Sequence, residues 1–203
     1  MTITETIRQH INALPQAEPF TAKQLLRFGQ RAAVDQALSR LCRAGSIRRV
    51  MRGVYAKPTP TAWGERLPET YEIVRSVATA QGEVVAPHGA VAVNRFGLST
   101  QNPMRLVLLT SGRSKVMQVR GQEVRLKHVA PSRLLEANTL AGLAVTALRY
   151  LGREQASLAQ TQQIVQQLPE VERQRLQRIT PSLPAWMIRL IAEVGNGTGD
   201  GHE

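Results

Sequence analysis

The chain has 203 residues, a hydrophobic fraction of 42%, an aromatic fraction of 4% and a formal net charge of +11. This length suits one or two domains with a mostly aliphatic core. The single cysteine, Cys42, excludes an internal disulfide framework and a thiolate-rich zinc site. The sequence has no run of about 18 apolar residues and no signal-like N-terminus, so we expect no membrane segment and a cytoplasmic location.

The positive charge is concentrated near the N-terminus. Residues 1–60 contain ten Lys or Arg and three acidic residues, whereas the rest of the chain contains sixteen and twelve. A short segment with this excess indicates a polyanionic partner, because each neutralised phosphate releases condensed counterions.

The first 57 residues follow the element order of a winged helix. Apolar spacing, capping residues and glycine stops predict three helices, over residues 2–14, 21–28 and about 31–44. Two short β-type segments follow, 46–50 and 54–57, with a glycine-containing turn between them. We therefore predict a winged helix-turn-helix domain over residues 1–57.

The third predicted helix and the hairpin carry the candidate DNA contacts. A major groove accepts a helix whose outer face has small and hydrogen-bonding side chains, and a wing contacts phosphates or the minor groove. An ordinary solvated helix face is the alternative for the helix, and a plain surface lysine is the alternative for Lys23. The candidate DNA-binding residues are Lys23, Arg31, Gln36, Ser39, Arg40, Arg43, Arg48, Arg49 and Arg52.

The rest of the sequence predicts a second domain, of α+β type, over residues 69–194. Proline and glycine mark residues 58–68 as a linker, and a Gly-rich tail at 195–203 is expected to be disordered. Within this domain we predict helices at 69–80, 87–96, 132–137, 140–151, 154–168, 170–179 and 183–194, and antiparallel strands at 105–110, 115–119 and 123–129. The predicted fold class is α+β: a winged helix followed by a mixed domain with a small antiparallel sheet and several helices.

The sequence offers no persuasive active site. The only aspartates are Asp35 and Asp200, Glu83 and Glu123 are the only strand-associated acidic pair, and the four histidines lack metal-ligand spacing. We therefore expect no catalytic residues, no metal and no cofactor, and we expect that the protein is not an enzyme.

Two stretches resemble a known family. Residues 33–55 resemble the winged-helix segment of AbiEi-like antitoxins of AbiE-type (type IV) bacterial toxin–antitoxin systems. Residues 87–103, from Pro-His-Gly-Ala-Val through Gln-Asn-Pro, are similar to the motif these antitoxins carry after the linker. The strand 106–110, the turn 112–115 and the segment Ala-Leu-Arg-Tyr-Leu-Gly at 147–152 continue the resemblance, which covers about residues 1–152.

The resemblance implies two activities. The winged helix would bind double-stranded DNA at inverted repeats in its own promoter and repress its operon, and the second domain would counteract a nucleotidyltransferase-like toxin. The motif positions are Asn94, Leu98, Thr100, Gln101 and Pro103; Asn94 and Gln101 could equally cap helices and satisfy buried backbone groups.

Two other functions stay open: a stand-alone winged-helix transcriptional regulator with a ligand-sensing domain, and a nuclease targeted by the winged helix. The absence of clear heptads predicts a monomer or weak dimer.

Overall fold

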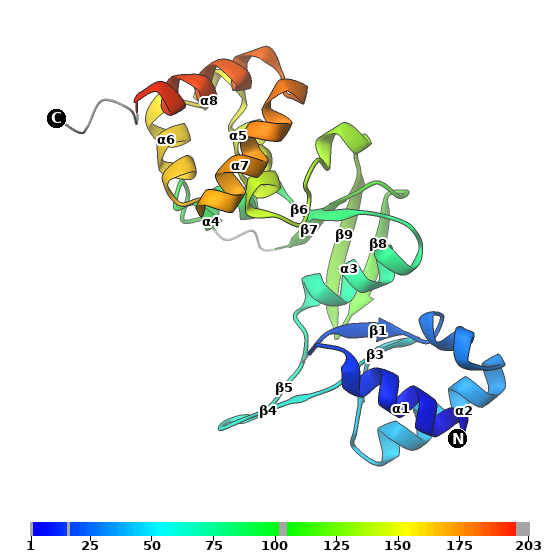
Figure 1. Cartoon of the computed structure of the whole chain (residues 1–203). Helices are drawn as coiled ribbons and strands as arrows, with labels where there is room; N and C mark the ends of the chain where they lie inside the picture. The colour runs from blue at the N-terminus through cyan, green and yellow to red at the C-terminus, as the bar shows by residue number, and fades with distance from the viewer. Residues whose placement is uncertain (1, 16, 102–104, 198–203) are drawn as a thin grey trace. The chain divides into compact units, whose positions relative to one another are not determined.

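The computed structural model describes residues 2–15, 17–101 and 105–197, and it is α+β, as the sequence predicts (Figure 1). The chain divides into two compact units. The first comprises Met1–Val84 and Val116–Val124, and the second comprises Val85–Lys115 and Arg125–Glu203. The division between the units therefore falls later in the chain than the sequence predicts, and the first unit is built from two separate stretches.

The first unit begins with a winged-helix arrangement. Its elements are α1 (Ile3–Ala13), β1 (Pro19–Thr21), the 3₁₀ helix η1 (Gln24–Phe28), α2 (Arg31–Arg43), β2 (Arg48–Met51) and β3 (Val54–Ala56). The three strands form a sheet of order β1-β3-β2, in which both pairings are antiparallel. The core contains Ile7 and Ile11 from α1 and Val34, Leu38 and Leu41 from α2.

The predicted start of the second helix was incorrect. We expected a helix over residues 21–28, but Thr21 ends β1, where it pairs with Val54. The Thr21 hydroxyl accepts a hydrogen bond from the Gln24 amide at 3.3 Å, and Gln24 Oε1 accepts one from the Thr21 amide at 2.6 Å. This exchange begins η1 only at Gln24, so Pro19–Thr21 is free to complete the sheet.

Residues 58–68, predicted to be an irregular linker, contain a β-hairpin formed by β4 (Thr59–Thr61) and β5 (Gly64–Arg66). Gly64 has φ +113°, a conformation that favours glycine, and the Thr61 hydroxyl donates to the Gly64 carbonyl at 2.7 Å. The prolines that suggested a linker are compatible with a short two-stranded ribbon, because both strands are edges.

The helix α3 (Thr70–Ala80) forms where the sequence predicts it, behind a capping box of Glu69 and Glu72. We assigned this helix to the second domain, but it belongs to the first compact unit. It packs beside β1, and the Ser76 hydroxyl donates to the Pro19 carbonyl at 2.9 Å. Burial of Ile73 and Val74 supplies the apolar contribution to this packing.

The second unit combines a sheet with a helical cluster. In chain order its elements are β6 (Val85–Pro87), α4 (Gly89–Arg95), β7 (Leu106–Thr110), β8 (Lys115–Val119), β9 (Gln122–His128), η2 (Pro131–Arg133), α5 (Leu140–Gln155), α6 (Leu158–Gln166), α7 (Glu170–Ile179), η3 (Thr180–Ser182) and α8 (Ala185–Gly197), with parts of β8 and β9 in the first unit. The sheet order is β6-β7-β9-β8, and β6 pairs antiparallel with β7. The helices enclose a core that includes Phe96, Leu148, Ile164 and Met187.

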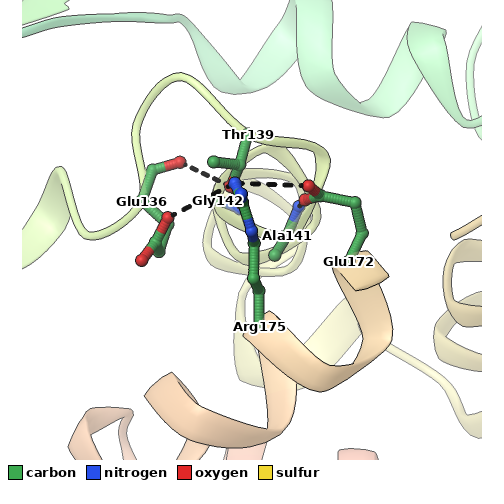
Figure 2. A network of polar contacts seen from close by, with 6 residues as sticks. All are labelled: Glu136, Thr139, Ala141, Gly142, Glu172 and Arg175. Atoms are coloured by element: carbon green, nitrogen blue, oxygen red, sulfur yellow. Dashed lines mark hydrogen bonds and ion pairs between the residues drawn. The ribbon is translucent and has the colours of Figure 1, made fainter. Parts of the chain in front are cut away.

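A polar network joins the start of α5 to α7 (Figure 2). The Thr139 hydroxyl accepts from the Gly142 amide at 3.0 Å, and Glu172 Oε2 accepts from the Ala141 amide at 2.9 Å. Arg175 lies 3.4 Å from Glu172 and 4.0 Å from Glu136, so one cation connects two carboxylates. The Thr139 and Glu172 hydrogen bonds satisfy two amides that the first turn of α5 leaves without helical partners, and Arg175 holds Glu172 in place.

Four expectations for the second unit need correction. Residue 87 does not open a helix as predicted, because it ends β6 and α4 begins only at Gly89. A helix over 132–137 is replaced by the short η2, since the left-handed Glu136 (φ 51°) interrupts any continuation. The helix predicted at 154–168 instead starts at Leu158, where Ser157 and Gln160 form a capping box. The tail predicted from residue 195 is still helical to Gly197, and residues 198–203 lie outside the described residues.

Candidate nucleic-acid interface

The helix α2 separates a buried face from an exposed polar face. Val34, Ala37, Leu38 and Leu41 are buried. The five predicted contact residues of this helix are all exposed: Arg31, Gln36, Ser39, Arg40 and Arg43. The helix therefore presents three guanidinium groups, an amide and a hydroxyl to solvent, which is the set of side chains that can read base edges.

Two contacts organise this polar face. Arg31 Nε lies 2.8 Å from Asp35 Oδ2, so the first arginine of the helix is paired with a carboxylate. Arg43 Nη2 donates to Ser39 Oγ at 3.2 Å, which holds its guanidinium along the helix. In the described part of the chain, Gln36 and Arg40 have no hydrogen-bond partner. Their polar groups remain available to a ligand.

The wing is the hairpin of β2 and β3. Arg49 is exposed on β2 opposite Tyr55, and Arg52 is exposed in the turn beside Gly53, whose φ is +74°. Neither arginine has a hydrogen bond or an ion pair among the residues that the structure describes. Burial raises the pKa of Tyr55, with Arg49 acting in the opposite direction, and the ring stacks on Phe20 at 6.1 Å. Tyr55 thus fixes the wing to the core, and the two arginines extend from it.

Arg48, a predicted DNA contact, is engaged within the protein. Its guanidinium donates to the Gly45 carbonyl at 2.9 Å and forms an ion pair with Glu65 at 2.7 Å. Its charge is therefore compensated within the protein, and it connects the α2–β2 turn to the β4–β5 hairpin. This ion pair was not predicted from the sequence, because Glu65 lies in the segment that we interpreted as a linker.

Lys23 is also engaged within the protein. Its ammonium group donates to the Ala80 carbonyl, at the C-terminal end of α3, at 3.3 Å. A lysine at the negative end of a helix is a common stabilising arrangement. The structural alternative for this residue therefore has direct support, and Lys23 is a weaker candidate for phosphate binding than Arg49 or Arg52.

Trp63 is the functional candidate that sequence reasoning missed. It lies between β4 and β5 at the tip of the hairpin, and its side chain is 98% exposed. The sequence signal that was missed is Trp63, which precedes Gly64 and lies between the polar triplets at 59–61 and 64–66. This pattern could have indicated a hairpin with a tryptophan at its tip. A single exposed apolar side chain is common on protein surfaces, so Trp63 is a candidate because its hairpin is joined to the wing by the Arg48–Glu65 ion pair, not because it is exposed.

The motif positions of the second unit have mainly structural contacts. Asn94 Nδ2 donates to the Gln101 carbonyl, and Leu98 packs against the helical core. Thr100 and Gln101 are exposed, and Pro103 lies outside the described residues. Asn94 therefore satisfies a backbone carbonyl, which is the structural interpretation that the sequence left open.

Among residues 2–15, 17–101 and 105–197, no group of three or more His, Cys, Asp or Glu side chains could hold a metal ion. Over the same residues, the helices are too short or too polar to span a bilayer.

These elements define an α+β protein whose first unit contains a winged-helix arrangement with a basic exposed face. The chain belongs to the family described as "Family of unknown function (DUF6088)", whose model matches residues 6–176. No curated protein sequence matches it. Among solved structures, the chain is similar to the Rv2827c protein from Mycobacterium tuberculosis, with 15% identity and a TM-score of 0.44 over 94% of this chain and 81% of that one.

Proposed function

We propose that this protein is a sequence-specific DNA-binding repressor that uses α2 as its recognition helix and the β2–β3 hairpin as its wing. The observation that carries the proposal is the set of exposed and uncompensated polar groups on these two elements: Gln36, Arg40, Arg49 and Arg52, with Arg43 beside them. Like charges so close together repel, and a phosphate backbone removes that repulsion.

The helix α2 and the β2–β3 hairpin make different contributions to binding. Gln36, Ser39, Arg40 and Arg43 lie on a helix that fits a major groove, where Arg pairs with guanine and Gln pairs with adenine. Arg49 and Arg52 lie on a hairpin, where they bind phosphates or enter a narrow minor groove. The helix therefore supplies sequence readout, and the wing supplies affinity that depends on salt.

The test is fluorescence anisotropy of the full chain on its own upstream DNA and on a scrambled duplex, over a salt series. We expect a preference of ~10³-fold or more for the upstream DNA and a steep salt slope. Replacing a wing arginine, as in Arg49→Gln, should weaken this binding. The matched control is Arg178→Gln, which also removes one positive charge, but from an exposed position on α7. Equal and weak binding to both duplexes would contradict the proposal.

We further propose that this repressor is the antitoxin of a pair whose toxin is nucleotidyltransferase-like. The support is the resemblance of residues 33–55 and 87–103 to AbiEi-like antitoxins. The test is growth of cells that express a nucleotidyltransferase-like protein encoded beside this gene, with and without this chain. Restored growth is expected, and persistent toxicity at matched expression levels would refute the antitoxin assignment.

A second candidate, a regulator with a ligand-sensing domain, is favoured by one observation. The second unit contains a cavity of about 210 Å³ with an unusual concentration of cationic side chains.

A further inference from the structure

The cavity lies entirely within the second unit, at the meeting point of β7, β9, η2 and the helices α4 and α5. Its volume is about 210 Å³, which is far more than a single water molecule needs. It is bounded by segments far apart in the sequence, and the wall includes His88, Leu109, Lys127, Arg133, Arg149 and Tyr150. Three of the segments that carry the family resemblance, at 87–103, 106–110 and 147–152, therefore contribute to one cavity.

The charge in this cavity has one sign. Lys127, Arg133 and Arg149 all line it, and no aspartate or glutamate among the described residues does. Lys127 and Arg133 have no ion pair within the described part of the chain. Burial, and then Arg133, lower the pKa of Arg149 from its ordinary value. Lys127 and Arg133 are exposed, so water screens part of the repulsion among the three cations, and an anion bound between them would remove the rest.

One polar atom in this group has no partner. Arg149 Nε is buried, and no described residue accepts a hydrogen bond from it. The same guanidinium makes only a long contact, 3.4 Å from Nη2 to the Ser132 carbonyl. Buried donors are nearly always satisfied, and a guanidinium fits the oxygens of a phosphate with two parallel hydrogen bonds. Arg149 therefore brings an incompletely paired guanidinium group to the cavity wall.

The aromatic wall is built with an unusually close approach. A Cβ placed on Gly89 would lie 2.3 Å from Tyr150 Cβ, so only glycine allows the tyrosine to rest on α4. The His88 ring meets the Tyr150 ring edge to face at 5.5 Å, and the Tyr150 side chain remains 52% exposed. This leaves part of a fixed aromatic ring at the cavity available to a planar group.

We propose that the cavity binds a nucleotide: its phosphate contacts Lys127, Arg133 and Arg149, and its base packs on Tyr150. The cationic wall and the aromatic wall together indicate this class of ligand, because a nucleotide combines a phosphate ester with a planar ring. The proposal does not depend on DNA binding, since no candidate residue of the wing or of α2 contributes to the cavity.

The test is isothermal titration calorimetry on the full chain with AMP, adenosine, ribose 5-phosphate and inorganic phosphate. We expect AMP to bind most tightly, ribose 5-phosphate and phosphate more weakly, and adenosine not at all. Lys127→Gln and Arg133→Gln should each weaken AMP about tenfold or more, because each removes a charged hydrogen bond. Both residues are exposed, so their loss leaves the core intact.

Two further variants separate the halves of the site. Tyr150→Leu should weaken AMP while leaving inorganic phosphate unchanged, and Arg178→Gln on α7 should change neither. Equal affinity for AMP and inorganic phosphate would overturn the nucleotide assignment. A ligand at roughly 5 mM occupies even a site with a millimolar Kd. If no phosphate ligand binds at that concentration, the proposed site does not exist.

Discussion

Arg48 Nη2 lies 2.7 Å from Glu65 Oε1, and this ion pair joins the base of the wing to the β4–β5 hairpin. Both side chains are more than a third exposed, so the pair contributes little to stability. Its larger effect is on charge, because it compensates one of the three arginines that follow α2.

This pair predicts that Arg48 and Arg49 differ in their effect on DNA binding. Arg49→Gln should lower affinity for all sequences and reduce the salt slope by about one, whereas Arg48→Gln should change the slope much less. Conversely, Glu65→Gln should free the Arg48 charge and raise affinity for scrambled DNA. Anisotropy over a salt series measures all three, and identical slopes for the two arginine variants would contradict the assignment.

Arg43 should contribute to sequence preference. Because its guanidinium is held along the exposed face of α2 by Ser39, we expect Arg43→Ala to cost about 1–3 kcal/mol at the cognate site and to relax base preference. The measurement is binding to a set of single-base variants of the upstream DNA. A loss of equal size on every duplex would instead make Arg43 a phosphate contact.

Trp63 should report on the hairpin directly. The chain has two tryptophans, and Trp186→Phe leaves Trp63 as the single emitter. Because the Trp63 side chain is 98% exposed, its fluorescence should be strongly quenched by acrylamide in the free protein. If the hairpin contacts DNA beside the wing, the upstream duplex should protect Trp63 from acrylamide. Unchanged quenching at saturating duplex would exclude the hairpin from the interface.

Gly89→Ala should destabilise the second unit. The added methyl group would meet the Tyr150 side chain at 2.3 Å, and overpacking of this kind costs about 1–3 kcal/mol. Gly195→Ala on α8 is the matched control, since nothing lies near its Cβ position and alanine favours a helix. Urea unfolding should show a lower midpoint for Gly89→Ala only; a midpoint unchanged from the parent would contradict the close approach.

The N-terminus of α5 offers a second test of stability (Figure 2). The Thr139 hydroxyl accepts from the Gly142 amide, so Thr139→Ala should cost about 1 kcal/mol, whereas Thr139→Ser keeps the acceptor and should cost less. Thermal unfolding of the two variants gives the comparison. Equal losses would attribute the effect to packing of the threonine methyl group rather than to the cap.

Sequence patterns predicted the elements whose signals are local. The helix α7 occupies Glu170–Ile179 as expected, and the partition of α2 into a buried face and a polar face follows from its spacing. β1 was missed because three residues carry no periodicity, and its pairing with β3 is a contact over more than thirty residues. Tertiary pairing of this kind determines short strands more than composition does.

The candidate sites show the same limit. Exposure of Arg40 and Arg49 could be predicted, but the partner of Arg48 could not, because Glu65 lies seventeen residues away in a segment with linker composition. The cationic cavity was also hidden. Lys127, Arg133 and Arg149 come from a strand, a 3₁₀ turn and a helix, and no spacing in the sequence indicates that they share one wall.

The first unit is assembled from two stretches of chain, with Val85–Lys115 of the second unit inserted between them. A fragment ending at residue 84 would lack the 116–124 strand pair, including the Gln122 side chain that accepts from Thr70 and the Arg120 side chain that donates to Pro68. A single crossover between genes therefore cannot exchange the first unit whole, although the winged-helix elements alone lie in one continuous stretch. A graft of the whole unit would need both stretches, with the inserted segment replaced by a loop.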